Sequence, residues 1–259
     1  MSERVTVEIA DHVAHVRLNR ADKMNALDPA MLEAIAAAGD AVNREEVRAV
    51  VLSGEGRAFC AGLDVASFGT LGTDPQALME RTHGRSNLFQ RVAMVWHELA
   101  VPVIAALHHT CFGGGLQIAL GADIRIAAPT TRMSVMEMKW GLVPDMGGMV
   151  LLPRLIRADI MKRLIYTGEV FAAEQAERWG LVTEIADDPQ ERARALAAEI
   201  AGKSPSAVRT AKALCELAAT EGPDAVLLAE SRLQAGLIGQ PHQMEAVMAN
   251  MQKRAPVFR

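Results

Sequence analysis

The amino-acid sequence predicts an α/β fold whose C-terminal part is wholly helical. Strand-like and helix-like patterns alternate up to about residue 190, whereas residues 190–252 are helical throughout. The chain has 259 residues, of which 50% are hydrophobic, so it is long enough to bury a sizeable core. No low-complexity linker separates the two parts. We therefore divide the chain into an α/β core over residues 1–195 and a helical region over residues 196–259.

The first half of the chain begins with a predicted β-hairpin. Apolar residues alternate over Val5–Ile9 and recur over Val16–Leu18, on either side of a turn at residues 10–12. Asp28-Pro29 provides an N-cap and a first-turn proline for a helix over residues 30–42. The remaining elements of this half are a strand over 47–52, a loop over 57–74, a helix over 75–99 and a buried strand over 101–107.

The second half begins at the glycine triplet of residues 113–115, which opens a short helix ending near Gly121. Two short strands follow, over 124–127 and 133–135. Helices dominate from about residue 157, with one strand near 181–185. The last helical stretch is interrupted at Ser204-Pro205, Gly222-Pro223 and Gln240-Pro241.

Composition and charge exclude several classes of protein. Lys and Arg number 27 against 31 Asp and Glu, so a net charge of −4 argues against a general attraction to nucleic acid or anionic lipid. The longest apolar run, 101–107, is far too short to span a membrane, and the N-terminus lacks the apolar stretch of a secretory signal. Cys60, Cys111 and Cys215 are scattered, which predicts buried thiols in a reducing compartment. We expect a soluble, cytoplasmic protein with no metal and no nucleic-acid partner.

Two glycine-bearing turns are candidates for backbone hydrogen-bond donors. Gly113-Gly114-Gly115 lies between a buried strand and a helix, where glycines permit close approach and leave N–H groups at the positive helix end. Such a site suits a phosphate or a developing oxyanion, and the same residues also suit tight packing of strand against helix. Ala61-Gly62-Leu63-Asp64 is a second such turn. Two N–H groups directed at one carbonyl oxygen are what enolate chemistry requires.

Two acidic residues are candidates for proton transfer. Glu137 lies between Met136 and Met138, immediately after a predicted strand. An apolar neighbourhood raises the pKa of a carboxyl group and suits it to shuttle protons. Asp145 follows within Val143–Gly148 and, taken alone, also fits a helix cap or an ion pair.

A series of short motifs in a fixed order resembles the crotonase superfamily, the enoyl-CoA hydratase/isomerase family. The resemblance spans nearly the whole chain, and it is the ordered series rather than any one motif that is specific. The motifs are Arg20–Leu27, Phe59–Asp64, Pro102–Ala106, Gly113–Gly115, Ala122–Arg125, Glu137 with Gly141–Pro144, Thr167-Gly168, Ala173–Ala176, Gly180–Val182 and Lys253–Phe258. Asn250 stands where the family usually has phenylalanine.

The resemblance implies a spiral of ββα units (the crotonase, or ClpP/crotonase-like, fold) with a helical C-terminal trimerisation region. It implies a homotrimer or a hexamer of two trimers, a CoA thioester as substrate and no separate cofactor. The thioester oxygen is expected between the backbone N–H groups of Leu63 and Gly114, in an oxyanion hole. The residues expected to bind CoA are Lys23, Ala26, Leu27, Ala61, Gly62, Leu63, Asp64 and, near the CoA phosphates of a neighbouring subunit, Lys253. The residues expected to form an apolar acyl pocket are Phe68, Met136, Trp140 and Met146.

Gln117 is the main departure from the hydratases of this family. Those enzymes activate water with two glutamates, at the positions of Gln117 and Glu137, and an amide can orient water but cannot take its proton. One carboxylate is sufficient to move a proton between C2 and C4, which favours an enoyl-CoA isomerase with Glu137 as the acid/base. Asp145 stands where the family's dienoyl-CoA isomerases have an aspartate, although those enzymes also carry an acid at position 117.

Two alternatives stay open at this point. The first is an enoyl-CoA hydratase in which Glu137 works with Asp145 or with a water held by Gln117. The second is a non-catalytic or RNA-binding relative. The basic residues that would serve the second alternative are Lys203, Arg209 and Lys212, on one C-terminal helix. Glu137 beside both oxyanion motifs favours an enzyme.

Overall fold

The structure is a computed structural model of the chain and describes residues 4–67 and 76–258. Its strands are β1 (Val5–Ala10), β2 (Val13–Leu18), β3 (Ala49–Gly54), β4 (Val103–Leu107), β5 (Thr110–Phe112), β6 (Ile124–Ala127), β7 (Arg132–Ser134), β8 (Phe171–Ala172) and β9 (Glu184–Ile185). Its α-helices are α1 (Pro29–Val42), α2 (Leu88–His97), α3 (Gly114–Leu120), α4 (Gly148–Leu151), α5 (Ala158–Thr167), α6 (Ala173–Trp179), α7 (Pro189–Ala201), α8 (Pro205–Ala218), α9 (Pro223–Leu237) and α10 (Pro241–Met251). Within these described ranges, no helix combines the length and the hydropathy needed to cross a membrane.

A six-stranded sheet in the order β1-β2-β3-β4-β6-β9 forms the centre of the fold. β1 and β2 are antiparallel, as the predicted hairpin requires, and the other neighbouring strands are parallel. A smaller sheet, β5-β7-β8, accompanies it. Strands and helices follow one another in repeated units, so the predicted α/β fold with a spiral of ββα units is confirmed.

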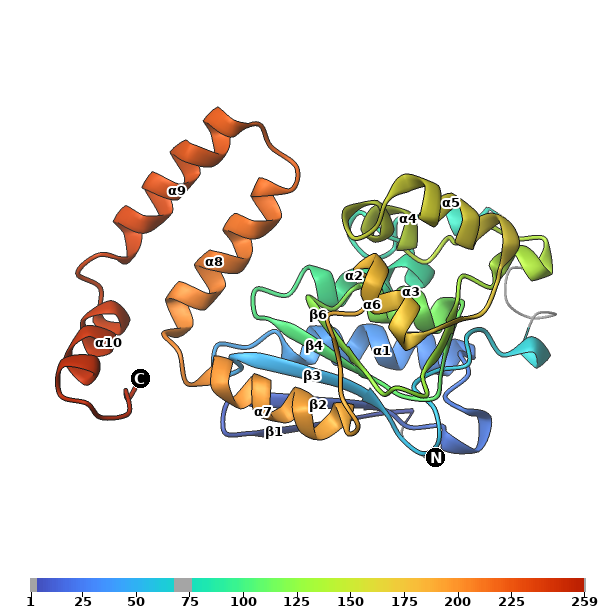
Figure 1. Cartoon of the computed structure of the whole chain (residues 1–259), viewed down its shortest axis with the longest axis horizontal. Helices are drawn as coiled ribbons and strands as arrows, with labels where there is room; N and C mark the ends of the chain where they lie inside the picture. The colour runs from blue at the N-terminus through green and yellow to red at the C-terminus, as the bar shows by residue number, and fades with distance from the viewer. Residues whose placement is uncertain (1–3, 68–75, 259) are drawn as a thin grey trace.

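Both faces of the large sheet are covered, and for this reason β3 is buried along its whole length. Val50 and Leu52 belong to the main core, which they share with α1 and α2. Ala49 and Val51 point the other way, into a smaller core beneath α7. Figure 1 shows α7 and α1 on opposite sides of the sheet. Ala197 of α7 is buried in the smaller core, so α7 packs against this face of the sheet.

The predicted helix over residues 75–99 is wrong in its first half. The described part of that half forms a 3-10 turn at Ala77–Met79 and a tight turn at Gly84, which has a φ of +65°. Helix α2 begins only after Asn87, whose side chain accepts a hydrogen bond from the backbone N–H of Gln90. The Gln90 side chain accepts one from the backbone N–H of Asn87 in return. The described residues 76–86 therefore contain no α-helix, and the capping box sets the start of α2.

The short strands β5 and β8 are absent from the sequence-based prediction. After β4 the chain turns at His109, which has a φ of +52°, and then begins β5 of the second sheet. β8 has two residues and pairs antiparallel with β7. Strands of this length do not display the period-2 alternation from which strands are predicted.

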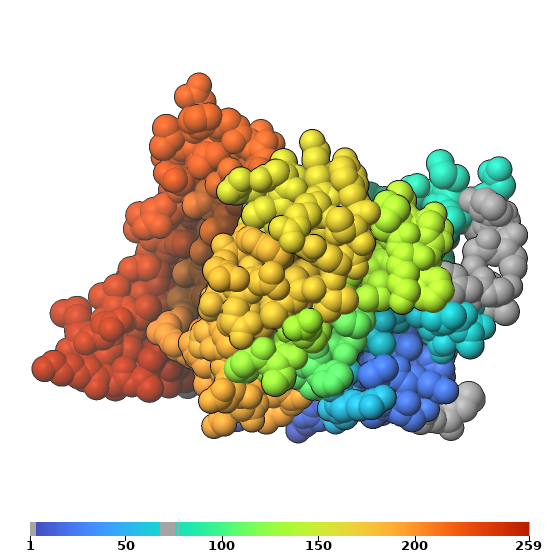
Figure 2. Space-filling view, turned by 45° about the vertical axis from the view of Figure 1, so that its right-hand side comes forward, coloured from blue at the N-terminus to red at the C-terminus, as the bar shows by residue number. Residues whose placement is uncertain are grey.

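Helices α8, α9 and α10 form an arm that stands to one side of the core (Figures 1 and 2). Each arm helix begins at a predicted interruption, with Pro205, Pro223 or Pro241 in its first turn. Within residues 204–258, Ala249 and Phe258 alone are buried. The arm therefore has no domain-sized core of its own in a single chain.

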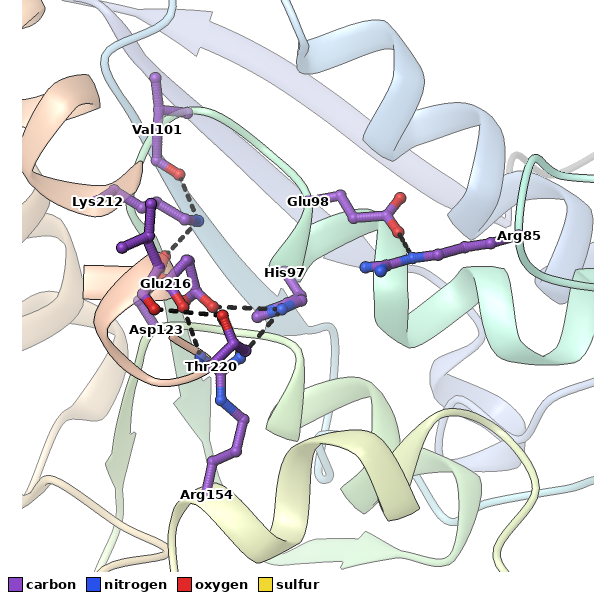
Figure 3. A network of polar contacts seen from close by, with 10 residues as sticks. Arg85, His97, Glu98, Val101, Asp123, Arg154, Lys212, Glu216 and Thr220 are labelled. Atoms are coloured by element: carbon purple, nitrogen blue, oxygen red, sulfur yellow. Dashed lines mark hydrogen bonds and ion pairs between the residues drawn. The ribbon is translucent and has the colours of Figure 1, made fainter. Parts of the chain in front are cut away.

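Ion pairs fasten α8 to the core (Figure 3). The Lys212 side chain is 8% exposed, and its Nζ lies 2.8 Å from Asp123 Oδ2. Lys212 also donates to the backbone oxygen of Val101 at 3.0 Å. One turn further along α8, Glu216 pairs with Arg154 at 2.7 Å. The first arm helix is thus held by charges that are partly removed from solvent.

These contacts also occupy the basic patch that was considered for RNA. Lys212 is committed to the core, and Arg209 donates to the backbone oxygens of residues 44, 45 and 47. Lys203 pairs with Glu199 on the preceding helix. Lys203, Arg209 and Lys212 therefore do not form a free cationic surface, because two of them hold the arm in place.

Candidate active site

Two glycine-bearing loops meet at the carboxyl end of the parallel strands. The loop after β3 is held to β5 by a hydrogen bond from the Phe112 N–H to the Cys60 oxygen, at 3.1 Å. On its other side, the Leu27 N–H donates to the Gly62 oxygen at 2.9 Å, and the Asp64 N–H donates to the Leu27 oxygen at 2.9 Å. The loop over residues 60–64 is thereby fixed between β5 and the loop that follows β2.

The backbone N–H groups of Leu63 and Gly114 are available to a ligand. Neither donates a hydrogen bond to the part of the chain that the structure describes. Gly62 has a φ of +89°, and a Cβ there would lie 2.7 Å from the Phe112 oxygen and 3.7 Å from Gly114 N. Gly114 begins α3, so its N–H is one of the unpaired donors at the positive end of that helix. Glycine at position 62 therefore lets the two loops come together.

A pocket of about 310 Å³ opens beside these two loops. Most of its wall is apolar, and the two ionisable side chains in the described wall are Glu137 and Asp145. The described wall consists of Ala61, Gly62, Leu63, Val65, Leu78, Phe89, Gly113, Gly114, Met136, Glu137, Trp140, Leu142, Asp145 and Met146. The structure thus brings both predicted oxyanion turns and both candidate acids to one cavity.

The predicted acyl pocket overlaps this wall in part. Met136, Trp140 and Met146 belong to the wall, whereas Phe68 lies outside the described residues. Four further apolar wall residues were not predicted from the sequence, namely Val65, Leu78, Phe89 and Leu142. Leu142 lies within the motif of Glu137 with Gly141–Pro144, so its position in that motif was a usable signal. Leu78 and Phe89 fell within the segment that was mistaken for one long helix.

Glu137 is the acid best placed to move a proton. It starts a 3-10 turn, Glu137–Trp140, shortly after β7. Its Oε1 accepts a hydrogen bond from Gln117 Nε2 at 2.6 Å, whereas its Oε2 is buried and has no partner among the described residues. Burial raises the pKa of Glu137, and the charge of Asp145 also raises it, while the hydrogen bond from Gln117 acts in the opposite direction. Oε1 is thus held by Gln117, whereas Oε2 is left to accept a proton.

Gln117 lies behind Glu137 and outside the described pocket wall. The residue is 2% exposed, and its Oε1 accepts hydrogen bonds from the backbone N–H groups of Met146 and Gly148, each at 2.9 Å. A Cβ at Gly148 would come within 2.7 Å of this oxygen, so the contact requires glycine there. Both lone pairs of the amide oxygen are therefore in use. This arrangement disfavours the alternative in which Gln117 holds the reacting water.

Asp145 lies in the pocket wall, on the turn that precedes α4. Desolvation raises the pKa of its carboxyl group. The helix-cap interpretation of Asp145 is wrong, because the N-cap of α4 is Gly147, which has a φ of +89° and no side chain to donate or accept. Asp145 is left facing the cavity, where its charge acts on Glu137.

Arg20 joins the two loops that were expected to bind CoA. Its guanidinium lies 2.6 Å from the Asp64 carboxylate and donates to the Ala26 oxygen at 3.0 Å. The hydrogen bond from Arg20 holds the pKa of Asp64 below its ordinary value. Ala26 and Leu27 are buried. Arg20 is a positioning residue that the sequence analysis did not single out, although it opens the motif Arg20–Leu27.

The two lysines expected to contact CoA lie at different ends of the molecule. Lys23 is exposed at the end of a 3-10 turn beside the loop after β3. Lys253 follows α10, and the tail beyond it returns to the amino end of β3, where Arg48 donates to the Phe258 oxygen at 2.9 Å. A single chain does not bring the two lysines together.

Comparisons with known proteins identify chains and structures that are similar to this one. A family model described as enoyl-CoA hydratase/isomerase matches residues 8–259. The chain is 31% identical over 259 residues to an (E)-benzylidenesuccinyl-CoA hydratase from Thauera aromatica, with 98% of each chain covered. It is 33% identical over 211 residues to the human mitochondrial Delta(3,5)-Delta(2,4)-dienoyl-CoA isomerase, with 78% of this chain and 64% of the isomerase covered. The crystal structure of an enoyl-CoA hydratase from Bacillus anthracis matches with a TM-score of 0.89 and 30% identity, covering 98% of each chain.

Proposed function

This chain belongs to the enoyl-CoA hydratase/isomerase family, and from that premise we propose that it shifts a proton along the acyl group of an enoyl-CoA, as an enoyl-CoA isomerase does. It is an enzyme of acyl-CoA thioesters. The pair Glu137 and Gln117 carries the proposal. Glu137 has one free oxygen, and the group that holds its other oxygen is an amide, which cannot act as a second acid or base.

The free N–H groups of Leu63 and Gly114 support the first step. When a proton leaves C2 of a thioester, negative charge develops on the thioester oxygen. Two fixed backbone donors in a site shielded from water stabilise such a charge by several kcal/mol. Gly62 and Gly113, which have positive φ values, allow the backbone to present both donors to one oxygen.

Glu137 Oε2 then transfers the proton. It takes the C2 proton as the C2–H bond breaks, and a dienolate forms. The same oxygen returns the proton to C4, so that a C4–H bond forms and the double bond moves from C3–C4 to C2–C3. No water or other reactant is consumed. A raised pKa suits this role, because the carboxyl group must both take and give the proton near neutral pH.

Asp145 has a secondary part in this proposal. It tunes the pKa of Glu137 through its charge, or it handles a second proton when the double bonds extend further along the chain. The human relative named as a dienoyl-CoA isomerase supports the second role. In both cases Asp145 acts from the pocket wall and needs no cofactor beyond the CoA of the substrate.

Hydration is the second candidate reaction, and the Thauera relative named as a hydratase favours it. In that case Asp145 would take the place of the glutamate that is Gln117 here. Mass spectrometry of the products from short 3-enoyl-CoA and 2-enoyl-CoA esters separates the two reactions, since isomerisation conserves mass and hydration adds one water. We expect mass-neutral conversion of the 3-enoyl-CoA. Hydration of crotonyl-CoA at ~10² s⁻¹ or faster would contradict this proposal.

The arm supports a homotrimer, or a hexamer of two trimers. Large apolar side chains of α9, α10 and their flanking residues are exposed in the single chain, and a second copy of this chain is the partner that would cover them. These side chains are Leu227, Leu228, Ile238, Met244, Val247, Met248 and Met251. In such an assembly Lys253 of one subunit would reach CoA bound to the next. Light scattering that shows a stable monomer at micromolar concentration would contradict the proposal.

A reducing cytoplasm is the compartment that we propose for this enzyme. Its three cysteines are free thiols, of which Cys60 and Cys111 are buried as predicted, whereas Cys215 is exposed and the prediction for it is wrong. Burial raises the pKa of Cys60 to about 12, which is the behaviour of an unreactive structural thiol.

A further inference from the structure

We propose that this pocket selects acyl groups that carry no charge and rejects acyl groups that carry a free carboxylate, with Asp145 as the residue that enforces the choice. This inference rests on the proposed function, which identifies the ligand as an acyl-CoA thioester. It deepens that function by assigning the class of acyl group, and its basis is the set of charges in the pocket wall.

Every charged side chain of the described wall is an acid. Glu137 and Asp145 are the two, and no Lys, Arg or His belongs to the wall over residues 4–67 and 76–258. The sequence of residues 68–75, Phe-Gly-Thr-Leu-Gly-Thr-Asp-Pro, contains no basic residue either. The described wall therefore offers the acyl group apolar surface and two acids, and it contains no basic side chain that could neutralise a carboxylate.

Two basic side chains near the pocket, Arg20 and Lys139, lie outside its described wall. Arg20 lies 2.6 Å from Asp64, in an ion pair whose side chains are 12% and 15% exposed. Lys139 is exposed, and its Nζ lies 5.6 Å from the centre of the Trp140 ring. Arg20 is thus paired with an acid, and Lys139 lies against the Trp140 ring rather than in the described wall.

A carboxylate on the acyl group would lose hydration on entering and gain no cationic partner. It would also face Glu137, which must be ionised to act as a base, together with Asp145. An acyl methyl group meets neither penalty, and it buries apolar area against Met136 and Met146. The selectivity thus comes from repulsion of the wrong ligand as well as attraction of the right one.

Calorimetric titration of the assembled, full-length protein tests this proposal with pentanoyl-CoA and glutaryl-CoA. The two thioesters have the same number of acyl carbons and differ by a terminal methyl or carboxylate, and neither has a double bond to isomerise. We expect pentanoyl-CoA to bind about tenfold more tightly or better. Asp145→Asn should reduce the ratio by improving glutaryl-CoA binding, with the affinity for CoA itself unchanged. Asp11→Asn, the same change in the exposed turn between β1 and β2, should leave the ratio unaltered.

Equal affinities in the wild type, or tighter binding of glutaryl-CoA, would overturn the proposal. A preference that survives unchanged in Asp145→Asn, and in the second variant Asp145→Ser, would overturn the role of Asp145. The proposed function is tested separately with 3-pentenoyl-CoA. A protein that prefers pentanoyl-CoA in binding and leaves 3-pentenoyl-CoA unchanged would contradict the isomerase and not the selectivity.

Discussion

The side-chain amide of Gln117 donates to Oε1 of Glu137 over 2.6 Å, and the oxygen of the same amide accepts two backbone N–H groups from the turn after Asp145. This relationship determines which oxygen of Glu137 is free, because Oε2 has no partner among the described residues. It also couples the acid/base to the turn that carries the second acid. Gln117 therefore fixes the position of the Glu137 side chain relative to this turn.

Replacing Glu137 by glutamine should lower the rate of 3-enoyl-CoA isomerisation by about 10³-fold, because the amide cannot accept the C2 proton. The fold should survive. Since burial raises the pKa of Glu137, the folded state holds a proton that the unfolded state releases, and stability falls as pH rises from the ordinary to the raised pKa. The variant lacks this loss, so its unfolding temperature at neutral pH should equal or exceed that of the wild type. A rate within a factor of ten of wild type would contradict the assignment.

Gln117→Glu should create or raise hydratase activity while isomerase activity changes little. A glutamate in the same rotamer would bring a carboxyl oxygen within hydrogen-bond distance of Glu137 Oε1, and the two acids would share a proton. The product mass from crotonyl-CoA measures the gain. Gln117→Met is the matched control, because it removes both the donor and the acceptor, and it should lower kcat without hydration. If neither variant differs from wild type, Gln117 does not position Glu137.

Gly114→Pro should lower kcat by about 10²- to 10³-fold, because it removes one of the two proposed oxyanion donors. A Cβ at this position would lie 2.7 Å from the Met146 sulfur and 2.8 Å from Leu27 Cδ1, so crowding alone has an effect. Gly114→Ala adds the same Cβ and keeps the N–H. The difference in kcat between these two variants therefore reports the loss of the donor together with the effect of the proline ring. Leu63→Ala should lower kcat only slightly, because it keeps the backbone N–H. Equal losses of kcat from Leu63→Ala and Gly114→Pro would contradict the proposed oxyanion hole.

The pH dependence of kcat/KM should show an acidic limb that reflects Glu137, because only the ionised carboxylate takes the C2 proton. Burial raises the pKa of Glu137, so this limb should lie above the ordinary range of a glutamate. The charge of Asp145 contributes to the rise. In Asp145→Asn the limb should therefore move to lower pH, whereas Asp11→Asn should leave it in place. A shift to higher pH in Asp145→Asn would contradict the sign of this coupling.

Lys212→Met should lower the free energy of unfolding by about 1–3 kcal/mol, because it leaves Asp123 and the Val101 oxygen without their buried cation. Lys203→Met removes an exposed pair with Glu199 and should change stability by less than about 0.5 kcal/mol. Urea unfolding of both variants, with light scattering of the folded proteins, makes the comparison. Equal effects would mean that the ion pair does not hold the arm to the core.

The sequence by itself determined the class of fold and the order of its motifs. Alternating apolar residues in the hairpin and the N-cap at Asp28 are local signals, since each element is specified by neighbours in the chain. The prolines that open the arm helices are equally local. The ordered series of motifs was sufficient to indicate the family, and the family comparison confirms it.

Tertiary structure alone decided the state of each site residue. No local pattern indicates that Gln117 gives its oxygen to the turn at Gly148, or that Arg20 holds Asp64, because these partners are far apart in the chain and meet only when the loops pack. Local patterns also do not indicate that Glu137 Oε2 has no partner among the described residues. Nor do they indicate that Lys212 pairs with Asp123 where α8 packs on the core, instead of contributing to a basic surface patch. Long-range packing removes water from some polar groups and pairs others. The chemistry of this pocket is set by which groups are paired and which are left open.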